Sequence, residues 1–195
     1  MPDERLSKVT VYALVTGLVS IGALLLAASL TDWRADLLTI GGVVYFAFLY
    51  LLLAALSFPV FGNLRAGTEG TAVLAALFSV GPLGTLLAAN LGQLSYEILA
   101  TLRGLRAQRK LRSLRELLAH AFLNVALISL GTLLAAQVYA TLGGKLPLAN
   151  FEAAQFVECS AALIAYTITV IAPKVALVYY LRGHAEPQSF SWRKL

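Results

Sequence analysis

Residues 68–102 read TEGTAVLAALFSVGPLGTLLAANLGQLSYEILATL, and this stretch decides how the chain is organised. It is apolar almost throughout, but it is longer than the roughly 20 residues that a straight helix needs to cross a bilayer core. Gly81 and Pro82 interrupt it, and a proline removes a backbone donor and clashes with the preceding helical turn. The sequence therefore predicts two membrane-spanning helices here, a short one over 68–80 and a longer one over 83–102.

The composition indicates a membrane protein. The chain has 195 residues, of which 59% are hydrophobic and 13% are charged, and its mean hydropathy is +0.79. Soluble domains carry about 45–50% apolar and roughly 25% charged residues. The composition excludes a disordered tail, a collagen-like fibre and a coiled coil, and the single Cys159 excludes a disulfide framework or a cysteine-based zinc cluster.

Four further apolar stretches bring the number of predicted spans to six. They cover residues 9–30, 37–58, 116–142 and 154–181. The first is longer than the apolar core of a cleaved signal peptide, so we expect it to be retained as a helix. The predicted fold class is an all-α polytopic membrane helix bundle, a single integral membrane domain over 1–195 with a Gly-Pro break between the third and fourth spans.

Lysine and arginine predict the orientation, because cytoplasmic loops carry the excess of positive charge. With six spans and both termini cytoplasmic, 12 of the 15 basic residues lie inside, Arg34 and Lys145 lie outside, and Lys174 lies within a span. A five-span alternative, with 68–102 as one bent helix, places ten inside and four outside. Six spans are favoured, and the absence of an N-glycosylation triplet fits a bacterial cytoplasmic (inner) membrane.

A basic cytoplasmic loop is predicted over 103–115. Its six positive charges are Arg103, Arg106, Arg109, Lys110, Arg112 and Arg115. Each cation near an anionic leaflet contributes on the order of 1 kcal/mol, so we expect the loop to lie on anionic lipid headgroups as an interfacial helix. Docking of a protein partner is the alternative function of the loop. Nucleic-acid binding is not expected, because no stacking aromatic residues interleave the cations.

Polar side chains inside the predicted spans form the first candidate site, because such groups are costly in hydrocarbon. Asn90, Gln93 and Glu97 share one face of the fourth span, and His120 and Asn124 share one face of the fifth. At 1.5 Å per residue, Glu97 and His120 lie at matching depths near the cytoplasmic side, which predicts a contact between them. The inner polar cluster of Glu97, His120 and Asn124 either holds helices together or carries a ligand or protons, and Asn90 and Gln93 are candidate ligand-binding residues.

A second candidate site lies near the outer end of the sixth span, at Gln155 and Glu158. An acidic group at that depth can coordinate a cationic or hydroxylated solute, or it can be wetted by the adjoining loop. Lys174 lies further along the same span. We expect its ammonium group to snorkel toward the inner headgroups, with pairing to Glu97 as the alternative.

Aromatic residues near span ends and around the second span are expected to contact the membrane. The residues predicted to face lipid around the second span are Tyr45, Phe46, Phe48 and Tyr50. The residues predicted to form an interfacial belt are Trp33, Tyr96, Tyr139, Tyr179 and Tyr180.

Several motifs of enzymes are missing from the sequence. It contains no GxxxxGK[ST] phosphate loop, no HExxH, no GxSxG and no paired cysteines. We therefore expect no enzymatic activity, no metal site and no cofactor, and any energy source must come from a partner or a gradient.

The run ALFSVGPLG over 76–84, with its continuation through 91–93, resembles the Gly-Pro turn and small-residue helix of the substrate-binding S-components of energy-coupling-factor vitamin transporters. This resemblance implies six spans with both termini inside. It also implies a ligand site near the outer face, which brings Gln155 and Glu158 forward. The family docks its coupling subunit through an Ala-x-x-x-Ala patch on the first helix, and Ala23 and Ala27 match that spacing.

A second likeness points to another class of protein. The run FLNVA over 122–126, followed by Val138, Tyr139 and the Leu-Gly-Gly of 142–144, is similar to the membrane input domains that precede bacterial signalling output modules. The sequence SFSWR over 189–193 is similar to the tail of those domains. No output module follows in this sequence, so a partner would have to supply the effector.

The sequence thus predicts a small-solute binding or uptake component that acts with an energising membrane partner. A sensory or assembly subunit of a membrane complex, with no transport activity, is the alternative. An outward-facing pocket above Gln155 and Glu158 would favour the first function, and a solidly packed interior would favour the second.

Overall fold

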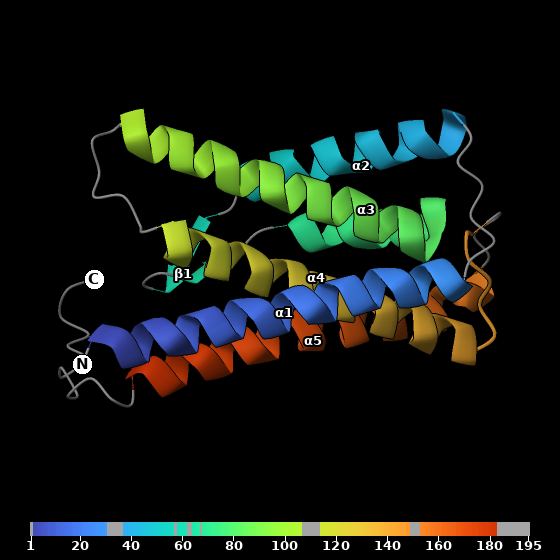
Figure 1. Cartoon of the computed structure of the whole chain (residues 1–195). Coiled ribbons are helices and arrows are strands. Elements are labelled where there is room, and N and C mark those ends of the chain that lie inside the picture. The colour runs from blue at the N-terminus through green and yellow to red at the C-terminus, as the bar shows by residue number, and fades with distance from the viewer. Residues whose placement is uncertain are drawn as a thin grey trace, which may run out of the picture.

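The computed structural model describes residues 2–30, 37–56, 58–61, 64–66, 68–106, 114–148 and 153–182. Over these residues the protein is all-α apart from one small hairpin, which confirms the predicted class, and its five helices lie lengthwise in a bundle (Figure 1). The helices are α1 (Pro2–Leu30), α2 (Leu37–Ala55), α3 (Glu69–Arg106), α4 (Leu114–Thr141) and α5 (Phe156–Arg182). A single 3-10 turn, Ala153–Gln155, leads into α5.

The helices have the length and composition of membrane-spanning segments. Within the residues whose side chains the structure describes, three helices contain apolar stretches long enough to cross a bilayer, namely Glu69–Arg103, Ala121–Thr141 and Phe156–Val175. Shorter apolar stretches occupy 17–29 of α1 and 39–55 of α2. Large hydrophobic side chains are exposed on every helix, including Leu25 at 67% and Ile168 at 59%, which fits a lipid environment rather than water. The chain is a multi-pass helical membrane protein.

A β-hairpin follows α2. Strand β1 (Phe58–Phe61) pairs antiparallel with β2 (Leu64–Ala66), with Phe58 opposite Ala66. The prediction that the second span continues to residue 58 was therefore wrong, because α2 ends at Ala55. Pro59 cannot continue a helix, but it is tolerated in a strand that has only one neighbour.

The long helix α3 reverses its direction at Gly81. Gly81 has φ 74° and ψ 179°, which lies in a region that residues with a Cβ rarely adopt. Figure 1 shows the first arm (69–80) running one way along the bundle and the second arm (82–106) running back. The predicted break at the Gly-Pro step is confirmed, although both arms belong to one element.

Electrostatic contacts support the reversal independently of the picture. The Lys174 ammonium interacts with the carboxylates of both Glu69 and Glu97, which lie near the two ends of α3. In a straight helix these two residues would be about 42 Å apart, at 1.5 Å for each of the 28 steps from one to the other. Only a chain that folds back at Gly81 brings both carboxylates to one lysine.

The reversal is fixed by local contacts. The Thr85 hydroxyl donates a hydrogen bond to the Gly81 carbonyl oxygen at 2.7 Å, and Pro82 supplies the preset φ that suits the first turn of a helix. Val80 packs so closely on Gly42 of α2 that a Cβ there would lie 2.6 Å from its methyl carbon. The turn is therefore held against α2 as well as within α3.

Helix α4 occupies the centre of the packing. It contacts α1, α3 and α5, while α2 packs mainly against α3. Gly131 allows α5 to pack closely against α4, because a Cβ at this position would lie 3.1 Å from the Tyr166 ring and 2.9 Å from Val170. Tyr166 also lies against Gly70 at the start of α3, so this one ring ties α5 to both α3 and α4.

The two ends of the bundle can be named from these elements. At the proximal end α1 begins and α5 ends, and at the distal end α3 reverses at Gly81 (Figure 1). At the distal end the Leu148 amide donates to the Phe78 carbonyl oxygen at 2.7 Å, so the segment after α4 is tied to the first arm of α3.

Candidate functional site

A chain of two hydrogen bonds, one buried and one partly buried, joins α2 to the second arm of α3. The Tyr50 hydroxyl donates to Gln93 Oε1 at 2.7 Å, and Gln93 Nε2 donates to Glu97 Oε1 at 2.9 Å. Tyr50 is 2% exposed and Gln93 is 5% exposed. Gly92 allows this approach, because a Cβ there would lie 2.8 Å from the Tyr50 ring. The predicted common face of Gln93 and Glu97 is confirmed.

Charged groups from two other segments surround this chain. Half-buried Lys174 of α5 interacts electrostatically with Glu69 and Glu97, and Glu69 also interacts with Tyr50 and Tyr166. The Oε2 atom of Glu69 is buried and has no hydrogen-bond partner among the described residues. We call this set the charged cluster; its members are Tyr50, Glu69, Gln93, Glu97, Tyr166 and Lys174.

The charged cluster carries an excess of negative charge. With Glu69 and Glu97 ionised and Lys174 protonated, its formal charge is −1, because tyrosine and glutamine are neutral. Among the described residues no group of three or more His, Cys, Asp or Glu side chains can hold a metal ion.

The predicted Glu97 to His120 contact lies outside the described residues, because the side chain of His120 is not among them. Asn124 is half-buried on α4. Glu97 Oε1 accepts a hydrogen bond from Gln93, and Lys174 interacts electrostatically with Glu97. Snorkelling of Lys174 to the headgroups and its pairing with Glu97 both stay predictions.

Further buried polar residues continue from the charged cluster toward the distal end. Asn90 is 9% exposed, and its Nδ2 donates to Ser129 Oγ of α4 across a long 3.5 Å. Asn90 Oδ1 is buried without a hydrogen-bond partner in the described part of the chain. Thr85 and Thr132 are also fully buried, and each hydroxyl donates to a carbonyl of its own helix.

Of the distal candidates Gln155 and Glu158, the second interacts with a tyrosine that the sequence did not single out for a site. Gln155 lies in the 3-10 turn and Glu158 in the first turn of α5, and both are half-buried. Glu158 interacts electrostatically with Tyr139, which is 0% exposed. Both Glu158 Oε2 and the Tyr139 hydroxyl are buried without a hydrogen-bond partner among the described residues.

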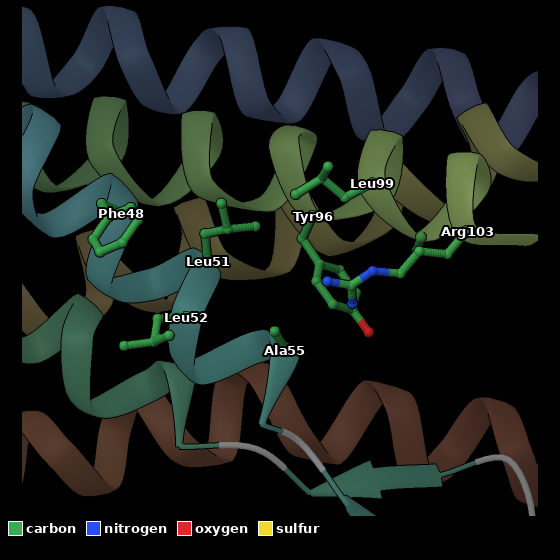
Figure 2. A pocket seen from close by; sticks show the side chains of 8 residues that line it. Phe48, Leu51, Leu52, Ala55, Tyr96, Leu99 and Arg103 are labelled. Carbon is green, nitrogen blue, oxygen red and sulfur yellow. The ribbon is translucent and has the colours of Figure 1, made fainter.

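A pocket of about 180 Å³ opens between α2 and the second arm of α3. Figure 2 shows Arg103 at the same groove as Tyr96, with its guanidinium group turned back toward the tyrosine ring. The lining residues are Phe48, Leu51, Leu52, Ala55, Tyr96, Leu99, Ala100 and Arg103. Neither Gln155 nor Glu158 contributes to this pocket.

The predicted basic loop is shorter in the structure, because α3 continues to Arg106 and α4 already begins at Leu114. Arg103 is an exposed residue of α3. The side chains of Arg106 and Arg115 are not described, and the predictions for Arg109, Lys110 and Arg112 lie outside the described residues. Expected contact with lipid headgroups stays a prediction.

The alanines of the expected docking patch are buried within the protein itself. Ala23 is 4% exposed and Ala27 is 0% exposed, on a helix that packs mainly against α4. Small side chains at this spacing allow close helix packing, and packing within this chain is enough to explain why both alanines are buried. Their docking role stays a prediction.

Two aromatic predictions were wrong. Tyr50, expected to face lipid, is buried in the charged cluster, and Tyr139, expected in an interfacial belt, is fully buried. Tyr139 packs edge-on against Phe78, with ring centroids 5.2 Å apart. Tyr45 and Phe48 are exposed at 60% and 65%, as expected for residues that face lipid. The signal for Tyr50 is its spacing from the small residues Ala47 and Ala54, which places all three on one helix face.

Comparisons with family models, with curated proteins and with solved structures find no match for this chain. The likenesses to S-components and to signalling input domains therefore stay hypotheses. What the structure shows is a helical membrane protein with a charged cluster whose charged members are half-buried.

Proposed function

We propose that this protein is a small-solute binding or uptake component of a bacterial cytoplasmic membrane, that it acts with an energising partner, and that the charged cluster is its solute site. The observation that carries the proposal is the electrostatic interaction of Lys174 with both Glu69 and Glu97 within apolar helices. Ionisable groups are expensive at membrane depth and mark solute or proton pathways when they face a bundle interior.

The proposal includes six membrane segments, with the two arms of α3 counted separately. The first arm has 12 residues and a length of about 18 Å, which is less than the roughly 30 Å of a bilayer core. Its N-terminus, with Glu69 in the first turn, therefore lies within the depth of the membrane. The positive end of the helix dipole stabilises a carboxylate there. Half-helices that end at membrane depth are typical of transporter binding sites.

The chemistry of the cluster favours a small donor-bearing cation, such as ammonium or a proton. The formal charge of the cluster favours a cation, and Glu69 Oε2 offers an acceptor that no described donor fills. The cluster offers the solute a single unfilled acceptor atom rather than a lined pocket. This favours a solute much smaller than a vitamin. The buried polar residues Asn90 and Ser129 and the Tyr139–Glu158 pair extend a polar route toward the distal end.

The test is a thermal-shift titration of the detergent-solubilised protein with ammonium chloride, against sodium chloride at equal ionic strength. A ligand at 100 times its Kd stabilises the folded protein by about 2.7 kcal/mol, which corresponds to a rise in Tm of roughly 5–10 °C for a chain of this size. We expect the shift with ammonium only, and we expect Glu69→Gln and Glu97→Gln to abolish it.

Glu158→Gln is the matched control, because it removes one carboxylate at the distal end and leaves the cluster unchanged. It should keep the ammonium response. Equal shifts from sodium and ammonium in the unaltered protein would contradict the proposal, and so would equal responses of Glu69→Gln and Glu158→Gln. Gel filtration of each variant separates loss of binding from loss of folding.

The second candidate function is a sensory or assembly subunit without transport. It is favoured by the exposed apolar face of α5, which carries Phe156, Leu163, Ile164, Ile168 and Ile171. The position of the pocket, away from Gln155 and Glu158, also agrees with it. Photo-crosslinking from position 164 in native membranes distinguishes the two, because a subunit gives one stoichiometric protein adduct at that face and a free-standing helix gives lipid adducts.

A further inference from the structure

The groove between α2 and the second arm of α3 has the shape and polarity of an amphiphile site. Its walls are the side chains of Phe48, Leu51, Leu52 and Leu99, and its cationic group is Arg103 (Figure 2). Phe48 and Leu52 are largely exposed, so the groove opens outward from the bundle rather than into the charged cluster. Its volume of about 180 Å³ is about six times the roughly 30 Å³ that a water molecule occupies, which fits a segment of an acyl chain.

The groove also runs in the direction that an acyl chain takes in a bilayer. From Phe48 to Ala55 α2 rises about 10 Å, and the second arm covers a similar length from Tyr96 to Arg103. Arg103 is the first basic residue along α3, and arginine side chains near the end of a membrane helix reach toward the headgroups. The cation is therefore placed at headgroup depth and the apolar walls at acyl-chain depth.

We propose that this groove binds one anionic phospholipid, with an acyl chain against α2 and α3 and the phosphate group on Arg103. A guanidinium group forms paired hydrogen bonds with phosphate oxygens, and it is less strongly hydrated than an ammonium group. Arg103 is also the first of six basic residues over 103–115 of the sequence, and this local excess of positive charge favours an anionic over a zwitterionic headgroup. The apolar walls exclude a free anion as the preferred occupant.

The bound lipid lies beside the charged cluster. Tyr96 lines the groove, precedes Glu97 in the chain and interacts electrostatically with Tyr50. A lipid chain between α2 and α3 therefore presses on the same helix pair that the Tyr50–Gln93 hydrogen bond joins. Lipid occupancy should stabilise this pair, and the inference does not depend on the nature of the solute.

The test is native mass spectrometry of the purified protein, released from detergent after titration with phosphatidylglycerol. Phosphatidylcholine is the zwitterionic comparison, and glycerophosphoglycerol supplies the headgroup without chains. We expect one phosphatidylglycerol to bind at least tenfold more tightly than phosphatidylcholine, and no retention of glycerophosphoglycerol. Equal retention of the two lipids, or retention of the chain-free headgroup as strong as that of phosphatidylglycerol, would overturn the proposal.

Two pairs of variants locate the site. Arg103→Gln should weaken the binding of the first phosphatidylglycerol about tenfold. Lys145→Gln removes an exposed charge at the distal end and should leave this affinity unchanged. Ala100→Phe fills the groove without a change of charge and should abolish the same binding event, whereas Ala172→Phe on the exposed face of α5 should not. Binding that responds equally to Arg103→Gln and Lys145→Gln, or that survives Ala100→Phe, would show general attraction to basic residues and contradict a groove site.

Discussion

The hydroxyl of Tyr50 illustrates how a single buried atom holds two helices of this protein together. It is the described donor to Gln93 Oε1, and a buried acceptor that loses its donor bears its full desolvation cost. Tyr50→Phe should lower the free energy of unfolding by about 1–3 kcal/mol, measured by SDS titration from mild detergent. Tyr45→Phe changes an exposed residue of the same helix and should change stability by less than about 0.5 kcal/mol. Equal effects of the two substitutions would mean that the bond contributes nothing.

Lys174 is the positive member of the charged cluster, and its removal should expose the repulsion between Glu69 and Glu97. Lys174→Met should destabilise the protein by about 3–5 kcal/mol, because it leaves uncompensated buried charge. Glu97→Gln in the same background should restore part of the loss, with a coupling energy of about 0.5–3 kcal/mol in a double-mutant cycle. Strictly additive free energies of unfolding would show that Lys174 and Glu97 do not interact.

The sequence predicts some residues of the cluster and misses others for a physical reason. Gln93 and Glu97 lie on one helix, where spacing alone determines a common face. Tyr50 and Glu69 come from other segments, and periodicity within one helix cannot show which residues tertiary packing brings to it. Glu69 in particular reads as a charge at the boundary of a span until the reversal at Gly81 places it near Glu97 and Lys174.

Among the helices, α3 depends most on one backbone conformation. Gly81→Ala places a Cβ at φ 74°, and strain of this kind costs about 1–3 kcal/mol although nothing lies within 4 Å of the added atom. Gly22→Ala is the matched control, because Gly22 is an exposed helical residue of α1 that also has open space around its Cβ. It should stabilise the protein by about 0.5–1 kcal/mol. The two alanine variants should therefore shift the unfolding midpoint in opposite directions, and shifts of the same sign would contradict the reversal.

Helices and breaks were easier to predict than the short elements. The apolar stretches and the Gly-Pro step correspond to helices and to the reversal, because hydrophobicity and proline act locally. The hairpin of β1 and β2 was missed, although Gly62–Asn63 between two short runs is a recognised hairpin signal. The signal is masked by Pro59, which follows a long apolar stretch and therefore indicates the end of a span.

For the whole molecule, the proposed orientation places the proximal end inside the cell. In a background with Cys159→Ser, Lys145→Cys should react with a membrane-impermeant maleimide from outside intact cells. Arg103→Cys should react only after the membrane is permeabilised, because the basic residues stay on the cytoplasmic side. The opposite pattern would invert the topology, and reaction of both positions from outside would contradict a membrane-spanning bundle.

The arrangement of the helices was not predictable from the sequence. Lipid-facing and protein-facing side chains are both apolar in a membrane protein, so hydrophobicity does not reveal which face packs inward. Helix α4 lies at the centre of the packing, and Ala27 and Tyr139 are buried. Small residues and ring packing cause this arrangement, and composition alone does not predict it.

The most direct test of the account measures the distance between the two arms of α3. Spin labels at Thr71 and Ser95, both exposed, are suited to double electron–electron resonance in a Cys159→Ser background. A helix that folds back at Gly81 places these positions about 20 Å apart or closer, given an interaxial distance of 8–10 Å between packed helices. A distance near 36 Å, as in a continuous helix at 1.5 Å per residue, would contradict the reversal and with it the charged cluster.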